Sequence, residues 1–142
     1  MFYTKVVGVT KRNDEEESIQ KLIDEMEDCG DEGKELYLLR DPRNKHDSNA
    51  IKVLSPVKQH IGYLSASVAE ELAPLIDNGE KVRVICKNIT GGEDLSWGCN
   101  IAIYIGSECD DIPIKKKKAS GCWRYLVYII LFILAVGIFK RM

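Results

Sequence analysis

The sequence lacks the short motifs by which many enzymes and metal proteins are recognised. Its 142 residues contain no Gly-rich phosphate loop of the Walker type. The five cysteines are odd in number and no two have Cys-x-x-Cys spacing, so neither a zinc ribbon nor a secreted disulfide framework is indicated. No serine or cysteine has a base that the sequence makes recognisable, and no signal peptide opens the chain. The sequence therefore gives no positive indication of catalysis, and we expect no enzyme.

Histidines are equally scarce, which limits the metal sites that the chain can build. His46 and His60, together with Asp47, are the combination that comes nearest to a metal pair. They have neither the i, i+4 spacing of ligands on a helix nor a third ligand close by in sequence. We therefore expect no metal ion and no cofactor, and a metal-dependent hydrolase acting on acid anhydrides or nucleic acid is only a distant alternative.

Charged residues are abundant but unevenly distributed. Residues 1–112 contain 13 Lys and Arg against 22 Asp and Glu, a formal charge of −9, whereas residues 113–142 contain seven Lys and Arg and no acid. Ten of the acids lie between Asp14 and Glu32. Because nucleic-acid binding depends on phosphate neutralisation, so acidic a domain is expected to bind nucleic acid weakly. The residues that can still form a neutral or basic face are Arg40, Arg43, Lys45, Lys52 and Lys58.

Alternating apolar residues predict a mainly β domain with inserted helices, an α+β arrangement. Short strands are expected, with turn-forming residues between them. Short antiparallel strands with an inserted helix are typical of a small barrel rather than of a parallel sheet. The expected strands cover residues 2–10, 35–39, 50–54, 60–64, 81–89 and 99–105.

Two amphipathic stretches predict helices. The first is expected to begin at Asn13 or Asp14, with acidic residues on its first turn. Its apolar side chains recur at helical spacing, so we expect them to be buried against the barrel, with the acidic face left for solvent or for a protein partner. These apolar residues are Ile19, Leu22, Ile23 and Met26. The second helix is expected to open with a capping box, Ser67-x-x-Glu70, and to be kinked or divided at Pro74.

A long apolar run near the C-terminus predicts a membrane anchor. Residues 122–139 carry one charge near their start and are just long enough for a transmembrane helix, because each helical residue adds about 1.5 Å. A buried helix of a soluble protein is the alternative, but so small a domain offers little to cover it. A basic linker, 110–121, precedes the run and a short tail, 140–142, follows it. The residues expected at the membrane interface are Lys115, Lys116, Lys117, Lys118, Trp123, Arg124 and Tyr125.

The flanking charges also predict an orientation. Because the larger positive cluster stays in the cytoplasm, we expect a single-pass, tail-anchored membrane protein whose N-terminal domain, residues 1–109, faces the cytoplasm. The lysine run would lie against anionic lipid headgroups of the bilayer.

The most distinctive stretch runs from Arg40 to Val53. It reads Arg-Asp-Pro-Arg-Asn-Lys-His-Asp-Ser-Asn-Ala-Ile-Lys-Val, and Ile-Gly-Tyr-Leu follows at 61–64. Turn-forming residues fill its first half and a strand pattern its second, so a polar loop is expected between two strands. This order resembles the HIRAN domain, which occurs in some fork-remodelling DNA translocases and as a stand-alone bacterial module. The resemblance covers about residues 2–105 and implies an OB-like antiparallel β-barrel that captures single-stranded DNA, typically at a 3′ end.

The resemblance also implies roles for individual residues. Asp47 would accept a hydrogen bond from the 3′-hydroxyl, Asn44 would contact a base or sugar, and Tyr63 would face the DNA. His46 stands where the family has a stacking aromatic, and Phe2, or as the second choice Tyr3, matches another stacking aromatic at the start of the first strand. Two phosphate-contacting residues of the family have no counterpart here, which again predicts weak binding. The alternative is that these polar side chains only shape the loop.

The sequence thus leads to two hypotheses of different class. The favoured one is a membrane-tethered, non-catalytic nucleic-acid-binding module that recognises single-stranded DNA 3′ ends. The other is a protein-interaction adaptor at the membrane, whose partner would dock on the acidic first helix or in the barrel groove.

Overall fold

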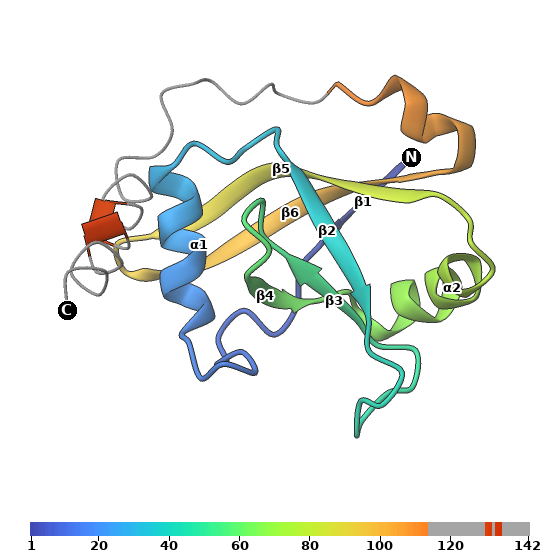
Figure 1. Ribbon diagram of the computed structural model, residues 1–142, viewed down its shortest axis with the longest axis horizontal. Helices are drawn as coiled ribbons and strands as arrows, with labels where there is room; N and C mark the ends of the chain where they lie inside the picture. The colour runs from blue at the N-terminus through green and yellow to red at the C-terminus, as the bar shows by residue number, and fades with distance from the viewer. Residues whose placement is uncertain (114–129, 132, 135–142) are drawn as a thin grey trace.

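The computed structural model describes residues 1–113, 130, 131, 133 and 134, and residues 1–113 form a strand-rich domain with two α-helices (Figure 1). The predicted class, mainly β with inserted helices, is confirmed. In chain order the elements are β1 (Phe2–Lys5), α1 (Ile19–Asp28), β2 (Glu35–Arg40), β3 (Ile51–Leu54), β4 (His60–Tyr63), α2 (Ala66–Asp77), β5 (Val82–Gly92), β6 (Leu95–Ile105) and the 3₁₀-helix η1 (Gly106–Asp111).

The strands form one antiparallel sheet that curls into a half-open barrel. Their order is β1-β6-β5-β2-β3-β4. Just after β1, Val7 forms an isolated antiparallel bridge with Tyr63, the last residue of β4, so that the two edges of the sheet meet. The Val7 amide donates to the Tyr63 carbonyl at 2.8 Å, and the Tyr63 amide donates to the Val7 carbonyl at 3.0 Å. The small OB-like barrel predicted from the sequence is therefore present in this half-open form.

Gly62 permits this closure. Its φ angle is +147°, and a Cβ at that position would lie 2.5 Å from both Val6 Cγ1 and the Val7 carbonyl oxygen. Any side chain at residue 62 would push the chain after β1 away from β4, so only glycine suits the meeting point of the two edges.

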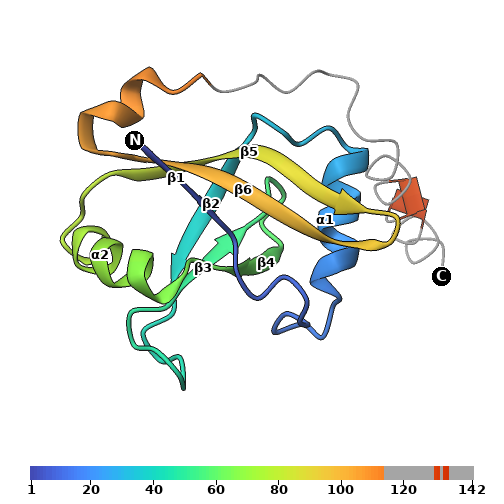
Figure 2. The same ribbon diagram turned by 180° about the vertical axis from the view of Figure 1, so that it is seen from behind.

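Helix α1 closes the core of the barrel. It packs against β4, β5 and β6, and Figure 2 shows it lying across one end of β5 and β6. The apolar stripe predicted for this helix is confirmed, because Ile19, Leu22, Ile23 and Met26 are all buried. From the strands, alternate side chains point inward, as period-two patterns require. Fully or almost fully buried strand residues include Ile51, Val53, Cys86, Cys99, Ile101 and Ile103.

The start of α1 differs from the prediction. The helix begins at Ile19 rather than at Asn13 or Asp14. The reason is that Asn13, itself 6% exposed, folds the preceding residues into a turn: its Oδ1 accepts hydrogen bonds from the amides of Glu15 and Glu17, at 3.0 and 2.9 Å. The acidic residues at 14–17 therefore lie in this turn and not on the first turn of the helix.

The start of α2 also differs from the prediction. It begins at Ala66 with Ser65 as the N-cap residue, and Ser65 makes no side-chain capping bond. The predicted capping box at Ser67 is thus wrong, because Ser67 already lies inside the helix. Pro74 is also inside the helix, which continues to Asp77, so the proline does not divide it.

The segment at 90–94, which lies between the expected strands 81–89 and 99–105, forms the tight end of the β5–β6 hairpin. β5 extends to Gly92 and β6 begins at Leu95. Gly91 and Gly92 have φ angles of +97° and +102°, and a Cβ on Gly91 would lie 2.2 Å from the Ser96 carbonyl oxygen. The two glycines therefore allow close approach of the strands rather than flexibility.

The C-terminal predictions lie almost wholly outside the described residues. This holds for most of the linker, 110–121, for most of the apolar segment, 122–139, and for the tail, 140–142. The lysines at 115–118 and the aromatic and basic residues at 123–125, predicted for the membrane interface, fall there too. Among the residues that are described, no helix has the length and apolar character that crossing a membrane requires.

Candidate nucleic-acid interface

The loop between β2 and β3 is held in shape by its own side chains. Asn44 is central: its Oδ1 accepts hydrogen bonds from the amides of His46 and Asp47, at 2.9 and 3.2 Å, and its Nδ2 donates to Asp41 Oδ2 at 3.1 Å. Asp47 Oδ1 accepts from the Asn49 amide at 2.9 Å. Such bonds from short polar side chains to nearby amides are typical of structured turns. Asp47 Oδ2 has no hydrogen-bond partner within the described part of the chain.

Arg40 fixes this loop to the body of the domain. Its guanidinium donates to the carbonyls of Ser48 and Ala50, at 3.2 and 3.0 Å. It also forms an ion pair with Asp77, the last residue of α2, at 3.0 Å. Charge-assisted bonds of this kind are stronger and more directional than neutral ones, so the loop stands on a rigid base.

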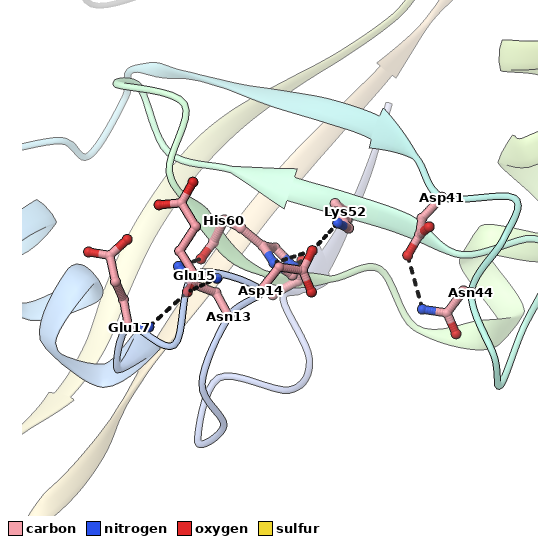
Figure 3. A network of polar contacts seen from close by, with 9 residues as sticks. Asn13, Asp14, Glu15, Glu17, Asp41, Asn44, Lys52 and His60 are labelled. Carbon is pink, nitrogen blue, oxygen red and sulfur yellow. Dashed lines mark hydrogen bonds and ion pairs between the residues drawn. The ribbon is translucent and has the colours of Figure 1, made fainter.

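The segment between β1 and α1 lies opposite and is tied to the sheet by two neighbouring residues (Figure 3). Asn13 Nδ2 donates to the His60 carbonyl in β4 at 3.3 Å. Asp14 forms an ion pair with Lys52 of β3. These contacts hold the segment against β3 and β4, where it faces the β2–β3 loop.

A groove of about 350 Å³ lies between the loop and the segment. The side chains of His60 and Tyr63, both from β4, meet in it edge to face, with ring centroids 4.9 Å apart and an interplanar angle of 89°. Polar and charged groups therefore line it from three parts of the chain. They are Asn44, His46 and Asp47 from the β2–β3 loop, Lys11, Arg12 and Asp14 from the β1–α1 segment, and His60 and Tyr63 from β4.

The structure brings together four of the five residues predicted to bind nucleic acid. Asn44, His46, Asp47 and Tyr63 all line this groove. Phe2 does not: it is partly buried and packs against the core. The prediction placed the second stacking aromatic at the start of β1, whereas the chain reaches the groove only after β1, at Val7 and Gly8.

The groove also contains four residues that the sequence did not predict to bind nucleic acid. They are Lys11, Arg12, Asp14 and His60. For Lys11 and Arg12 a signal existed, because a basic pair directly follows a strand and precedes a turn-forming asparagine. No local signal marks Asp14 or His60. Their positions depend on the closure of the barrel, which brings distant segments side by side.

The imidazole of His60 is neutral at pH 7. Burial lowers the pKa of His60 below its ordinary value, and the charge of Lys52 lowers it further. Its Nε2 lies 2.9 Å from the Gly62 carbonyl, to which it donates, so Nδ1 is the acceptor nitrogen. Nδ1 is buried and unpartnered among the described residues, at 4.0 Å from Asp14 Oδ2.

Two further groups in the groove have shifted titrations. The hydrogen bond from the Lys52 ammonium holds the pKa of Asp14 below its usual range, and Asp14 raises the pKa of Lys52 in return. Burial, assisted by the charge of Asp14, raises the pKa of Tyr63, so the phenol stays protonated at neutral pH. The groove thus offers the hydroxyl of Tyr63, the neutral imidazole of His60 and the ionised carboxylate of Asp14. Lys11 and Arg12 add two cations, and Asp47 adds a second carboxyl group. The described residues contain no group of three or more His, Cys, Asp and Glu that could hold a metal ion.

A half-open antiparallel barrel with a polar groove beside a structured loop is the architecture of an OB-like binding module. The family model described as the HIRAN domain matches residues 2–106. The chain belongs to the HIRAN domain family, as the loop motif and the strand after it indicated.

Parts of two curated plant proteins are similar to this chain. The chain is 49% identical over 97 residues to a Fanconi-associated nuclease 1 homolog from Oryza sativa subsp. japonica, a match that covers 66% of this chain and 8% of that protein. A Fanconi-associated nuclease 1 homolog from Arabidopsis thaliana is 46% identical over 46 residues, 32% of this chain and 5% of the relative. The chain therefore spans less than a tenth of the length of the curated relatives it matches.

Among solved structures, a protein from Lactobacillus plantarum superposes with a TM-score of 0.55 at 20% identity, covering 72% of this chain and 92% of that one. The fold is thus shared with a protein of low sequence identity. The HIRAN domain of human HLTF superposes with a TM-score of 0.49 at 18% identity, covering 82% of this chain and 92% of that domain.

Proposed function

We propose that the chain is a non-catalytic module that binds single-stranded nucleic acid in the groove, with DNA 3′ ends as the preferred ligand. The observation that carries the proposal is the convergence of Asn44, His46, Asp47 and Tyr63 on one groove, in a domain of the HIRAN family. A second observation is that Asp47 is partly exposed and that its Oδ2 has no hydrogen-bond partner within the described residues, whereas Oδ1 accepts from the Asn49 amide.

The preference for an end follows from the chemistry of a carboxylate. Asp47 repels a phosphate but accepts a hydrogen bond from a hydroxyl, and a hydrogen bond to a charged acceptor contributes roughly 1.5–3 kcal/mol. The exposed ring of His46 and the phenol of Tyr63 can each stack on a base, which is worth about 1–3 kcal/mol. Lys11 and Arg12, which line the groove, supply cations for a phosphate. With so few phosphates neutralised, we expect affinity in the micromolar range or weaker, with mild salt dependence.

The test compares free and blocked 3′ ends. Short single-stranded DNA labelled at its 5′ end is titrated with the full chain, once with a 3′-hydroxyl and once with a 3′-phosphate. We expect the phosphorylated end to bind about tenfold more weakly, because Asp47 then faces an anion. Asp47→Asn keeps the oxygen that accepts from the Asn49 amide but removes the charge. The difference in affinity between the 3′-hydroxyl and the 3′-phosphate oligonucleotides should therefore shrink. His46→Ala should weaken both oligonucleotides alike.

Asp94→Asn is the matched control, because Asp94 is an exposed carboxylate in the β5–β6 turn and does not line the groove. It should leave both affinities unchanged. Equal affinity for free and blocked ends would remove the end-binding proposal. A protein-interaction role, with a partner on the acidic face of α1, would then be the better hypothesis.

We further propose that the domain is held at a membrane by residues 122–139, with the domain in the cytoplasm. The support is the apolar run itself and the excess of lysine before it. The full chain should sediment with membranes and stay there during carbonate extraction. Release by carbonate would contradict the span, and protection of the domain from protease in vesicles that expose their cytoplasmic face would contradict the orientation.

A further inference from the structure

The outer face of β1, β6 and β5 carries an exposed aromatic residue between two lysines. Tyr3 is 57% exposed, and Lys87 Nζ lies 3.6 Å from the centroid of its ring. Tyr3, Lys5 and Lys87, together with Asn88 and Asn100, line a shallow hollow of about 390 Å³. None of these residues lines the groove described above. We call this surface the β1–β5 face.

Strand register explains why these residues meet. β1 pairs with β6 so that Tyr3 stands beside Ala102 and Lys5 beside Asn100. β6 pairs with β5 so that Asn100 stands opposite Asn88, and Asn100 Nδ2 donates to Asn88 Oδ1 at 3.3 Å. A lysine, two amides and a tyrosine are thereby aligned across three strands.

The charge of the β1–β5 face is opposite to that of the domain. Within residues 1–113 neither Lys5 nor Lys87 forms an ion pair. Two acids border this face, and neither forms an ion pair with Lys5 or Lys87. Glu32 Oε1 accepts a hydrogen bond from the Ile89 amide of β5 at 2.9 Å, and the Glu35 carboxylate of β2 is held by the Arg83 guanidinium at 2.6 and 2.9 Å. Two uncompensated lysines with an exposed aromatic therefore stand together in a part of the chain whose formal charge is −9.

We propose that the β1–β5 face is a second binding site for a nucleic-acid strand, one that contacts its phosphates and a base rather than its end. Lysines contact phosphates, an exposed aromatic ring gives a base a stacking surface, and amides bond to the edges of bases or to sugars. Lys87 exchanges its contact with the Tyr3 ring for a phosphate and so uncovers the ring. The β1–β5 face requires no free 3′ end. The inference rests on the proposed function only in assuming that one nucleic-acid strand contacts both the groove and this face.

The position of the face relative to the groove fits a continuous strand. β1 leads directly from Tyr3 to Gly8, which lines the groove, and at the rise of extended chain these residues are at most about 16 Å apart. Figure 2 shows β1 passing in front of β6 and continuing into the segment that borders the groove. A strand held at its end in the groove therefore needs only a few more nucleotides to reach Lys5 and Tyr3.

The test is the dependence of affinity on oligonucleotide length. The full chain, kept in solution by a mild detergent, is titrated with single strands of about 4 and about 15 nucleotides, lengths that span the usual site sizes of such folds. The triple variant Tyr3→Ser/Lys5→Gln/Lys87→Gln should bind the longer strand about tenfold more weakly and leave the shorter one unchanged. Its log–log salt slope should fall by about 1.4, since each phosphate neutralised on a single strand contributes about 0.7.

A matched control exists in the same molecule. Tyr37 and Lys58 form another exposed tyrosine–lysine pair, with Nζ 5.0 Å from the ring centroid. Lys58 was one of the lysines that the sequence allowed on a basic face, but in the structure neither it nor Tyr37 lines the groove or the β1–β5 face. Tyr37→Ser/Lys58→Gln should keep the affinity of the parent for both lengths. Lys87→Glu alone, at an exposed position of β5, should reproduce the loss for the longer strand in a protein that melts like the parent.

The outcomes separate this inference from the end-binding proposal. If a 3′-phosphate has no effect but the triple variant still loses the longer strand, the groove proposal fails and the β1–β5 face stands. The inference is overturned if the longer strand binds the triple variant as it binds the parent, or if both lengths lose affinity equally. It is also overturned if the lysine substitutions reduce binding only to vesicles of anionic phospholipid, which would make the face a lipid contact.

Discussion

Replacing Asn13 by alanine tests whether one side chain holds the wall of the groove. Asn13 accepts hydrogen bonds from two amides, at 3.0 and 2.9 Å, and donates to the His60 carbonyl at 3.3 Å. A buried donor left without a partner costs about 1–3 kcal/mol, and loss of a capping side chain costs about 0.5–2 kcal/mol. Water can replace part of these bonds at a half-buried turn. We therefore expect Asn13→Ala to lower the free energy of unfolding by about 2 kcal/mol, the middle of these ranges.

The measurement has a global and a local part. Urea denaturation of the full chain gives the free energy of unfolding, and hydrogen exchange should show faster exchange at the Glu15 and Glu17 amides, which lose their acceptor. Asn78→Ala is the matched control, because Asn78 is exposed at the end of α2. This substitution should lower the free energy of unfolding by no more than about 0.5 kcal/mol. The reasoning is refuted if Asn13→Ala and Asn78→Ala are equally stable and exchange at the two amides does not change.

Three further substitutions test the fold and the titration of the groove. Ile23→Asp puts a charge where the side chain is fully buried, so it should lower the free energy of unfolding by at least about 3 kcal/mol; a melting temperature equal to that of the parent would show that α1 is not docked. Gly62→Ala should open the Val7–Tyr63 bridge, seen as faster hydrogen exchange at the Val7 amide, whereas retention of slow exchange would contradict the clash. Because the folded state lowers the pKa of His60, the unfolded state binds more protons as pH falls through about 6.5, so stability should decline between about pH 7 and 5. His60→Gln should flatten that decline, and an unchanged pH profile would show that another group causes it.

Local patterns in the sequence were sufficient to predict which helices and strands form, but not the residues at which the helices begin. The stripe from Ile19 to Met26 predicts the buried face of α1 correctly, because helical spacing and burial have the same origin in the packing of one helix. The start of α1 was missed because Asn13 can cap a helix or close a turn, and the residues after it fit both. The choice depends on the His60 carbonyl, which is remote in sequence.

The sequence was sufficient to predict the residues that the β2–β3 loop contributes to the groove, but not those of the β1–α1 segment on its opposite side. Asn44, His46 and Asp47 lie within four residues, so a motif contains them, and Tyr63 follows in the neighbouring strand. Lys11 and Arg12 join them only because the sheet closes on itself. Phe2 was predicted from the family resemblance, which implies a second stacking aromatic at the start of the first strand, whereas in the structure its side chain is partly buried and packs against the core.

The bridge between Val7 and Tyr63 couples ligand binding to the completion of folding. These residues belong to opposite edges of the sheet, so their pairing is a non-local contact, and such contacts are slow to form because the intervening chain must first be ordered. A molecule whose barrel has not closed has the β2–β3 loop but lacks a groove. Any ligand that spans both walls therefore binds only the closed state and stabilises it by mass action. The same linkage means that a mutation at the seam which leaves the groove-lining side chains unchanged, such as Gly62→Ala, lowers affinity by reducing the closed population rather than by changing the site.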